Sequence, residues 1–269
     1  MKKAPRWLGV GRTETGYVRK TNQDVFAAIN SCNFWIVADG MGGHPAGDVA
    51  AHLAVDAATQ QAKTLLAAKE LAPEVQQEHL ADTIVEANRA IHEKIREEPS
   101  LKGMGTTAVA MTIAPTSAPV AYIAHLGDSR AYRFHAGVLT QLTRDHTLVA
   151  VLLERGLITD ATARAYPDRH VLAKGLGMGQ DMMPEVTSTP LALDDILLLC
   201  SDGLTKMLDD AEIASILAKA QRNPSRACHD LVEAALDRGG EDNVTVIVCA
   251  YTVPTKTGSL AIDKTLPAM

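Results

Sequence analysis

Five aspartates stand where strand-like segments enter or leave the expected core of this 269-residue chain. Asp24 precedes VFAAI, Asp39 follows NFWIVA, Asp128 follows AYIAHLG, Asp202 follows ILLLCS, and Asp242 precedes NVTVIV. Any one of them could be a turn residue that hydrogen-bonds its own backbone. As a set they indicate more, because all five could converge on one rim of a β-sandwich.

Carboxylates gathered in this way repel one another, and a bound cation is the usual remedy. Ligands that are all oxygen favour a hard ion, so Mg²⁺ or Mn²⁺ is expected rather than zinc or copper. Two such ions about 4 Å apart can share a water, lower its pKa and present hydroxide to a phosphorus atom. The pattern is typical of a hydrolase that needs no protein nucleophile.

Apolar periodicity predicts the elements that position these aspartates. A hairpin is expected over residues 25–38, with its turn at Asn30-Ser31, and two long amphipathic helices over 46–66 and 73–97. Further strands are expected over 106–114, 118–126, 130–137, 195–200 and 243–253, and two helical stretches over 209–238, broken at Asn223-Pro224.

Strands that come in runs, followed by consecutive pairs of helices, favour an α+β fold over an alternating parallel sheet. We expect a four-layer sandwich of two antiparallel β-sheets flanked by pairs of helices. Residues 144–170 are mixed and rich in turns, which indicates a small insertion over a sheet edge. We expect one domain over residues 1–254 and a flexible tail over 255–269.

Composition excludes several other classes of protein. The formal net charge of -6 provides no basic footprint for nucleic acid or an anionic membrane. No segment approaches about 18 uninterrupted apolar residues, and the N-terminus has no signal-peptide pattern, so we expect a cytoplasmic protein. The four cysteines form no CxxC pair and are expected to be core residues rather than zinc ligands or disulfides.

Seven motifs together resemble, in order and spacing, those of the PPM-type (type 2C) metal-dependent protein phosphatases in their compact bacterial form. They are VRKTNQD (18–24), VADGMGGHPAGDVA (37–50), MGTTAV (104–109), GDSRAYR (127–133), LTRDH (142–146), LLLCSDGLT (197–205) and EDNVTVIV (241–248). The match covers residues 9–252. It implies the sandwich fold with a small flap beside the active site, at about residues 143–170.

The resemblance also implies roles for individual residues. Asp39 corresponds to the carboxylate that bridges two catalytic ions, with Asp24 and the Gly40 carbonyl completing one site and Asp202 and Asp242 the other. Asp128 resembles the ligand, shared with Asp202, of a third and weaker ion.

Two further residues of the motifs correspond to groups that act on the substrate. Arg19 matches the arginine that holds the substrate phosphate, for which a bidentate donor is apt. His44 matches the histidine proposed as general acid, although a histidine before Pro45 could equally cap or pack a helix. The chain departs from the family pattern at Gln23, where glutamate is usual, and at Lys174, where arginine is usual. We expect Lys174 to affect the flap or its packing rather than the metals.

The function implied is hydrolysis of phosphoserine and phosphothreonine by direct attack of a metal-bridging hydroxide. The partners implied are phosphorylated proteins, including a bacterial eukaryotic-like Ser/Thr kinase and its targets, and a monomer is the default expectation. Three alternatives stay open: an inactive relative that binds phosphoproteins, a phosphoesterase for nucleotides or sugar phosphates, and a structural metal-binding protein. The presence of all five aspartates argues against an inactive relative, and Arg19 argues against a structural metal-binding protein.

Overall fold

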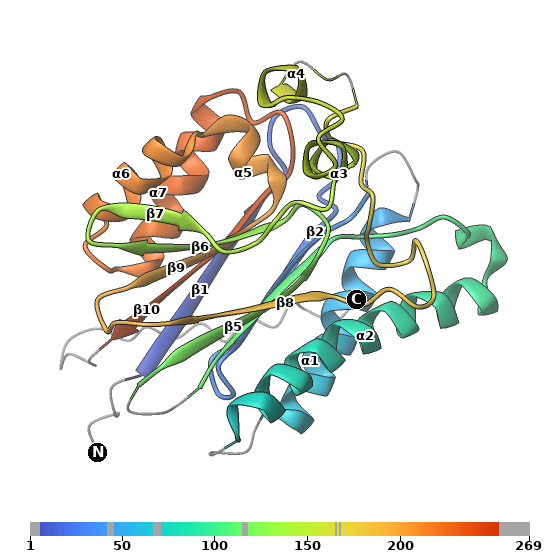
Figure 1. Cartoon of the computed structure of the whole chain (residues 1–269), viewed down its shortest axis with the longest axis horizontal. Helices are drawn as coiled ribbons and strands as arrows, with labels where there is room; N and C mark the ends of the chain where they lie inside the picture. The colour runs from blue at the N-terminus through green and yellow to red at the C-terminus, as the bar shows by residue number, and fades with distance from the viewer. Residues whose placement is uncertain are drawn as a thin grey trace.

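The computed structural model describes residues 6–41, 46–66, 71–114, 118–164, 166 and 168–252. Two five-stranded antiparallel sheets form its centre (Figure 1). The first has the strand order β1-β10-β9-β6-β7 and comprises β1 (Arg6–Glu14), β10 (Val244–Thr252), β9 (Ile196–Cys200), β6 (Arg130–His135) and β7 (Val138–Gln141). The second has the order β2-β3-β4-β5-β8 and comprises β2 (Asp24–Ile29), β3 (Phe34–Asp39), β4 (Ala108–Ile113), β5 (Val120–Leu126) and β8 (Glu185–Pro190).

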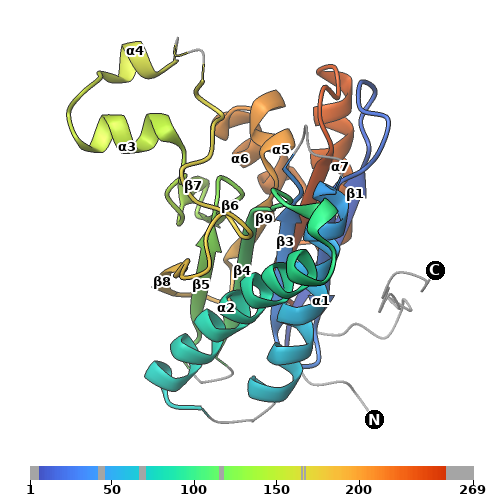
Figure 2. The same ribbon diagram turned by 90° about the vertical axis from the view of Figure 1, so that its right-hand side faces the viewer.

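Helices cover the outer faces of both sheets, so the predicted four-layer sandwich is confirmed (Figures 1 and 2). On the second sheet lie α1 (Gly47–Leu65) and α2 (Pro73–Glu97), followed by the short 3-10 turn η1 (Pro99–Leu101). On the first lie α5 (Asp202–Met207), α6 (Asp210–Lys219) and α7 (Pro224–Asp237). None of the described helices is long and apolar enough to cross a membrane.

Local sequence accounts for where several of these helices begin. Asp209 and Glu212 form a reciprocal capping box at the start of α6. The Asn223 side chain accepts a hydrogen bond from the Arg226 amide, and Pro224 occupies the first position of α7. The break predicted at Asn223-Pro224 is therefore a capped helix start.

Apolar side chains fill the spaces between the layers in three clusters. One lies under α1 and α2, one under α5, α6 and α7, and the third lies between the two sheets, where Trp35 and Leu199 are fully buried. All four cysteines are free; Cys200, Cys228 and Cys249 are buried as predicted, whereas Cys32 is only half-buried. The sheets are thus rigid supports for the loops at their ends.

A small flap projects from the end of the sandwich that carries these loops. It contains α3 (Leu148–Glu154) and α4 (Asp160–Arg164), which stand clear of the two sheets (Figure 2). A bridge between Thr147 and Leu172 and a hydrogen bond from the Ala173 amide to the His146 carbonyl close its base. The mixed segment expected over residues 144–170 is this flap.

Candidate metal-binding cleft

The five aspartates come from both sheets and meet at one end of the sandwich. Asp24 begins β2 and Asp39 ends β3, and the two residues lie opposite each other in the strand register. Asp202 begins α5 just after β9, and Asp242 lies two residues before β10. Asp128 lies in the connection from β5 to β6, where the chain passes from one sheet to the other. The sheet topology therefore confirms that strand ends far apart in sequence share one rim.

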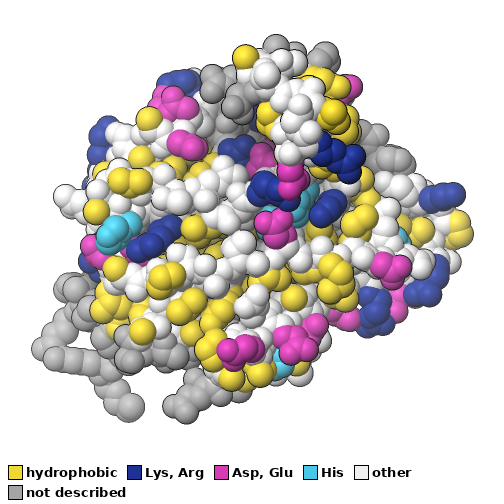
Figure 3. Space-filling model, viewed as in Figure 1, with side chains coloured by type: hydrophobic (Ala, Val, Ile, Leu, Met, Phe, Trp, Pro, Cys, Tyr) yellow, Lys and Arg dark blue, Asp and Glu magenta, His cyan; other side chains and the backbone are white. Residues whose placement is uncertain are grey.

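A cleft of about 620 Å³ opens at this rim. The Gly40 backbone and the side chains of Asp39, Asp128, Asp202 and Asp242 line it. Asp24 lies beneath them, only 5% exposed. In the space-filling view, acidic, basic and histidine side chains gather near where α3 overhangs the sandwich (Figure 3). The cleft is thus a concave surface with a dense concentration of carboxylates.

Burial and mutual repulsion change the proton affinity of these carboxylates. Burial raises the pKa of Asp24 to about 6, with hydrogen bonds opposing the rise and Asp202 and Asp242 adding to it. Burial, followed by the charges of the other four aspartates, raises the pKa of Asp39 well above its usual value. Burial and then Asp202 raise the pKa of Asp128 to about 7. The polypeptide alone therefore leaves negative charge in the cleft incompletely compensated.

Two basic side chains supply part of the compensation. The Arg19 guanidinium forms a bidentate ion pair with Asp242, with Nε 2.8 Å from Oδ1 and Nη2 3.0 Å from Oδ2. Lys206 Nζ lies 2.6 Å from Asp202 Oδ2 and 2.9 Å from Asp242 Oδ2. Although burial opposes it, these two cations lower the pKa of Asp242. Asp242 is therefore the most fully paired of the lining carboxylates.

The donor set fits divalent cations. Asp24 Oδ2 accepts a 2.7 Å hydrogen bond from Ser201 Oγ, but its buried Oδ1 has no hydrogen-bond partner among the described residues. A buried, unpartnered carboxylate oxygen beneath a cluster of further carboxylates is costly unless a cation neutralises it. Carboxylate and carbonyl oxygens are the ligands that Mg²⁺ and Mn²⁺ favour.

Hydroxyl groups and an amide hold the metal-facing loops in place. Thr107 Oγ1 accepts a hydrogen bond from the Asp39 amide and contacts Ser129 Oγ at 2.7 Å, which ties β3 to the loop that carries Asp128. The Asn243 side chain accepts from the Gln23 amide and donates to the Thr15 and Thr21 carbonyls. Asn243 thus fastens the loop that carries Arg19 beside Asp242, and its backbone amide donates a 3.0 Å hydrogen bond to Asp242 Oδ1.

Gly40 occupies a position where a side chain has no room. A Cβ there would clash with the Gly47 carbonyl oxygen and would lie 2.9 Å from the Gln23 carbonyl oxygen. The glycine lets the chain turn directly from β3 past the start of α1. The backbone at residue 40 consequently lines the cleft itself.

A second cavity, of about 440 Å³, adjoins the cleft under the flap. Val149, Leu153 and Ala163 of the flap form its apolar side, and Arg169 and Lys206 are among its cationic residues. His170 lines both cavities. The flap therefore forms a wall directly beside the carboxylates.

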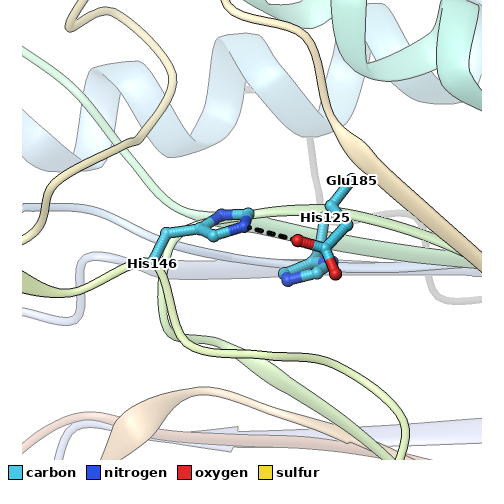
Figure 4. A group of neighbouring side chains, drawn as sticks. All are labelled: His125, His146 and Glu185. Atoms are coloured by element: carbon cyan, nitrogen blue, oxygen red, sulfur yellow. Dashed lines mark hydrogen bonds and ion pairs between the residues drawn. The ribbon is translucent and has the colours of Figure 1, made fainter. Parts of the chain in front are cut away.

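A pair of stacked histidines braces the base of the flap (Figure 4). The rings of His125 and His146 are 4.5 Å apart and nearly parallel, and His146 Nε2 lies 3.2 Å from Glu185 Oε2. His146 Nδ1 accepts a hydrogen bond from the Gly127 amide, so the ring proton is on Nε2. The Nε2–H group donates a hydrogen bond to Glu185. Both nitrogens of His146 are occupied, so we interpret the group as a support for the Gly127–Asp128 loop, not as a metal site.

The structure places most of the predicted site residues together. Arg19, Asp39, Gly40, Asp128, Asp202 and Asp242 line the cleft, and Asp24 lies below it. Gln23 also lines the cleft, whereas Lys174 is not among the described lining residues. The pKa of His146 is lowered by burial first and then by the charges of His125 and Lys174. His44 and the tail 255–269 lie outside the described residues.

Two of the titratable residues that line the cleft, Lys206 and His170, were not predicted. Lys206 follows Asp202 by four positions in a helix, a spacing that puts both side chains on one face and could have revealed it. His170 carries no comparable signal, since it reaches the cleft only through the path of the flap.

Sequence comparisons show which known proteins the chain resembles. A family model described as Protein phosphatase 2C matches residues 16–237. A serine/threonine phosphatase, stp, of Listeria innocua is 40% identical over 243 residues, which cover 88% of this chain and 93% of that protein. The serine/threonine protein phosphatase PstP of Mycobacterium tuberculosis is 37% identical over 238 residues, covering 88% of this chain and 43% of that longer protein.

Solved structures show the same likeness. The catalytic domain of PstP in complex with two manganese ions aligns with a TM-score of 0.77 and 33% identity, covering 92% of this chain and 99% of that one. A serine/threonine phosphatase from S. agalactiae aligns with a TM-score of 0.80 and 31% identity, covering 91% and 99%.

Proposed function

The chain belongs to the protein phosphatase 2C family, and from this premise we propose that its cleft hydrolyses phosphoserine and phosphothreonine in proteins with the help of divalent cations. The protein is thus a serine/threonine phosphatase. One observation supports this most directly: four aspartates line a single cleft, the fifth is buried below them, and Arg19 lines the same cleft with a bidentate guanidinium. That combination provides both for cations and for a phosphate.

Mn²⁺ or Mg²⁺ is the cofactor that the oxygen donors favour. Asp24, Asp39 and the Gly40 carbonyl would hold one ion, and Asp39, Asp202 and Asp242 the other. Asp128 and Asp202 would hold a third, weaker ion. Bound ions supply Lewis-acid stabilisation of the phosphate oxygens and lower the pKa of water.

The protein's own part is to orient the phosphate. Arg19 already presents Nε and Nη2 side by side to the two oxygens of Asp242. The same planar pair of donors matches two oxygens of a phosphate, and the side chain is 44% exposed, so it is accessible to a substrate. His44 remains our proposed general acid toward the leaving alkoxide.

The substrates we propose are phosphorylated proteins, including a eukaryotic-like Ser/Thr kinase and its targets. The flap and its adjoining cavity support a polypeptide substrate, because they extend the cleft beyond the space that a phosphate needs. A single catalytic domain over residues 1–254, with its flap at about 143–170, a monomeric state and a cytoplasmic location remain predictions.

Phosphate release from a phosphothreonine peptide tests this proposal against the two main rivals. We expect Mn²⁺-dependent release from the peptide at a higher kcat/KM than from a sugar phosphate or a nucleotide. Faster turnover of the small esters would favour a phosphoesterase of another class. Peptide binding without turnover, in the presence of Mn²⁺, would favour an inactive binding module.

A further inference from the structure

Lys206 is a cation inserted among the proposed metal ligands. Because α5 begins at Asp202, the residue four positions later returns to the same face of the helix. Its Nζ spans Asp202 Oδ2 at 2.6 Å and Asp242 Oδ2 at 2.9 Å, and only 25% of the side chain is exposed. An ammonium group therefore connects the carboxylates that would hold the second ion.

The surroundings keep this ammonium group charged. One oxygen of Asp202 and one of Asp242 lie within 2.9 Å of Nζ, and opposite charges at this distance favour the ammonium form. Lys206 lines the same cleft as Asp39 and Asp128, so its positive charge acts on those carboxylates as well. Lys206 thus acts on the whole acidic cluster as a fixed unit charge.

Asp242 has no oxygen free of a cationic partner in this arrangement. Arg19 holds both of its oxygens, and Lys206 holds Oδ2 in addition. A divalent ion that coordinates Asp202 and Asp242 would compete with Nζ for oxygen lone pairs, and two positive charges at this distance repel strongly. The cavity beneath the flap, which Lys206 also lines, provides space for a displaced ammonium group.

We propose that Lys206 is a built-in competitor of the divalent cation, which weakens metal binding at Asp202 and Asp242 and moves off these carboxylates when the metal binds. This inference rests on the proposed function only for the identity of the ion. It makes Lys206 a positioning residue of the metal centre. Half-loading with metal should therefore require a higher free metal concentration than in a chain with a neutral residue at this position.

Isothermal titration with Mn²⁺, in the absence of substrate, tests the competition. We expect Lys206→Met to bind the ion on the order of tenfold more tightly than the wild type, because a repelling charge within a few ångströms is removed. Lys206→Arg retains the charge and should bind no more tightly than the wild type. Lys219→Met, which removes an exposed charge at the end of α6, should also match the wild type. Unchanged affinity in Lys206→Met, or tighter binding in Lys206→Arg, would overturn the proposal.

A second measurement needs only the wild-type protein and decides the matter if Lys206→Met does not fold. An amine-acylating reagent is applied with chelator or with saturating Mg²⁺, and modification of Lys206 is measured by mass spectrometry relative to Lys219. Metal should increase acylation of Lys206 several-fold by releasing its amine from the two carboxylates. Equal or lower acylation with metal would contradict the inference. Neither readout depends on turnover, so an inactive protein that behaves as predicted would refute the proposed function alone.

Discussion

Replacing Asp24 by asparagine should stabilise the metal-free protein. Burial raises the pKa of this carboxyl from 3.8 to about 6. The folded chain therefore retains the proton between about pH 4 and pH 6, where the unfolded chain has lost it, so stability falls as the pH rises through this window and stays reduced above it. A difference of about two pKa units corresponds to about 3 kcal/mol, and an asparagine side chain does not titrate.

The assay is urea unfolding of both proteins in chelator from pH 4 to pH 8. The variant should match the wild type near pH 4 and gain stability up to about 3 kcal/mol above pH 6.5, because its side-chain oxygen can still accept from Ser201. Asp194→Asn, at a position that is 61% exposed, is a matched control and should change little. With saturating Mn²⁺ the order should reverse, since the variant lacks a ligand.

A metal-free Asp24→Asn protein that is no more stable than the wild type at pH 7.5 would refute the reasoning. It would show that the carboxylate is accommodated at residue 24 without a cation. The fit of the cleft to metal ions would then lose its main energetic support.

Three further predictions concern the residues around the cleft. Arg130 forms a bidentate ion pair with Asp145, with Nε 2.8 Å from Oδ1 and Nη2 2.7 Å from Oδ2. Arg130→Met removes this pair and should reduce the free energy of unfolding, measured by urea denaturation, by about 2 kcal/mol. An unchanged midpoint would mean that the pair adds nothing. Gly40→Ala should lower the thermal midpoint, with a loss of about 2 kcal/mol, because its Cβ meets two backbone carbonyl oxygens. A midpoint equal to the wild type would show that the turn before α1 can open. Arg19→Lys retains the charge but loses the planar fork, so KM for a phosphothreonine peptide should rise about tenfold; an unchanged KM in steady-state kinetics would remove Arg19 from phosphate binding.

Strong periodicity made part of the fold predictable. The hairpin over residues 25–38 and the helix α2 were predicted because apolar residues recur there at the spacing of a strand or a helix. The strand β1 was not predicted, since RWLGVGRTE contains two glycines and three charged residues. It is a strand because it pairs along its full length with β10, at the other end of the chain. Such long-range pairing is not visible in a local window.

The edge strand β8 was missed for a related reason. Its sequence EVTSTP is mostly polar and ends in proline, which is typical of a loop. It pairs with only one neighbour, β5, so polar residues are tolerated there. The stacked pair of His125 and His146 likewise depends on the path of the chain at the base of the flap, which local spacing does not specify.

The aspartates of the cleft were predictable because each lies at a strand end, a feature that can be read from local sequence. Lys206 was not predicted because one of its partners, Asp242, lies 36 residues away in the chain. The ligands and Arg19 were therefore easier to predict from sequence than Lys206, the second cation that balances them. His44 stays a prediction.

The most direct test of the account compares Mn²⁺ binding and phosphate release in the wild type and Asp39→Asn. Asp39 ends β3 in the cleft, and its pKa is raised by burial and by all four other aspartates, so it should be the carboxylate that both ions share. Equilibrium dialysis should show that the folded variant loses bound Mn²⁺, and its kcat on a phosphothreonine peptide should fall by about 1000-fold or more. Full metal-dependent turnover by Asp39→Asn would contradict the claim that this cleft is the catalytic centre.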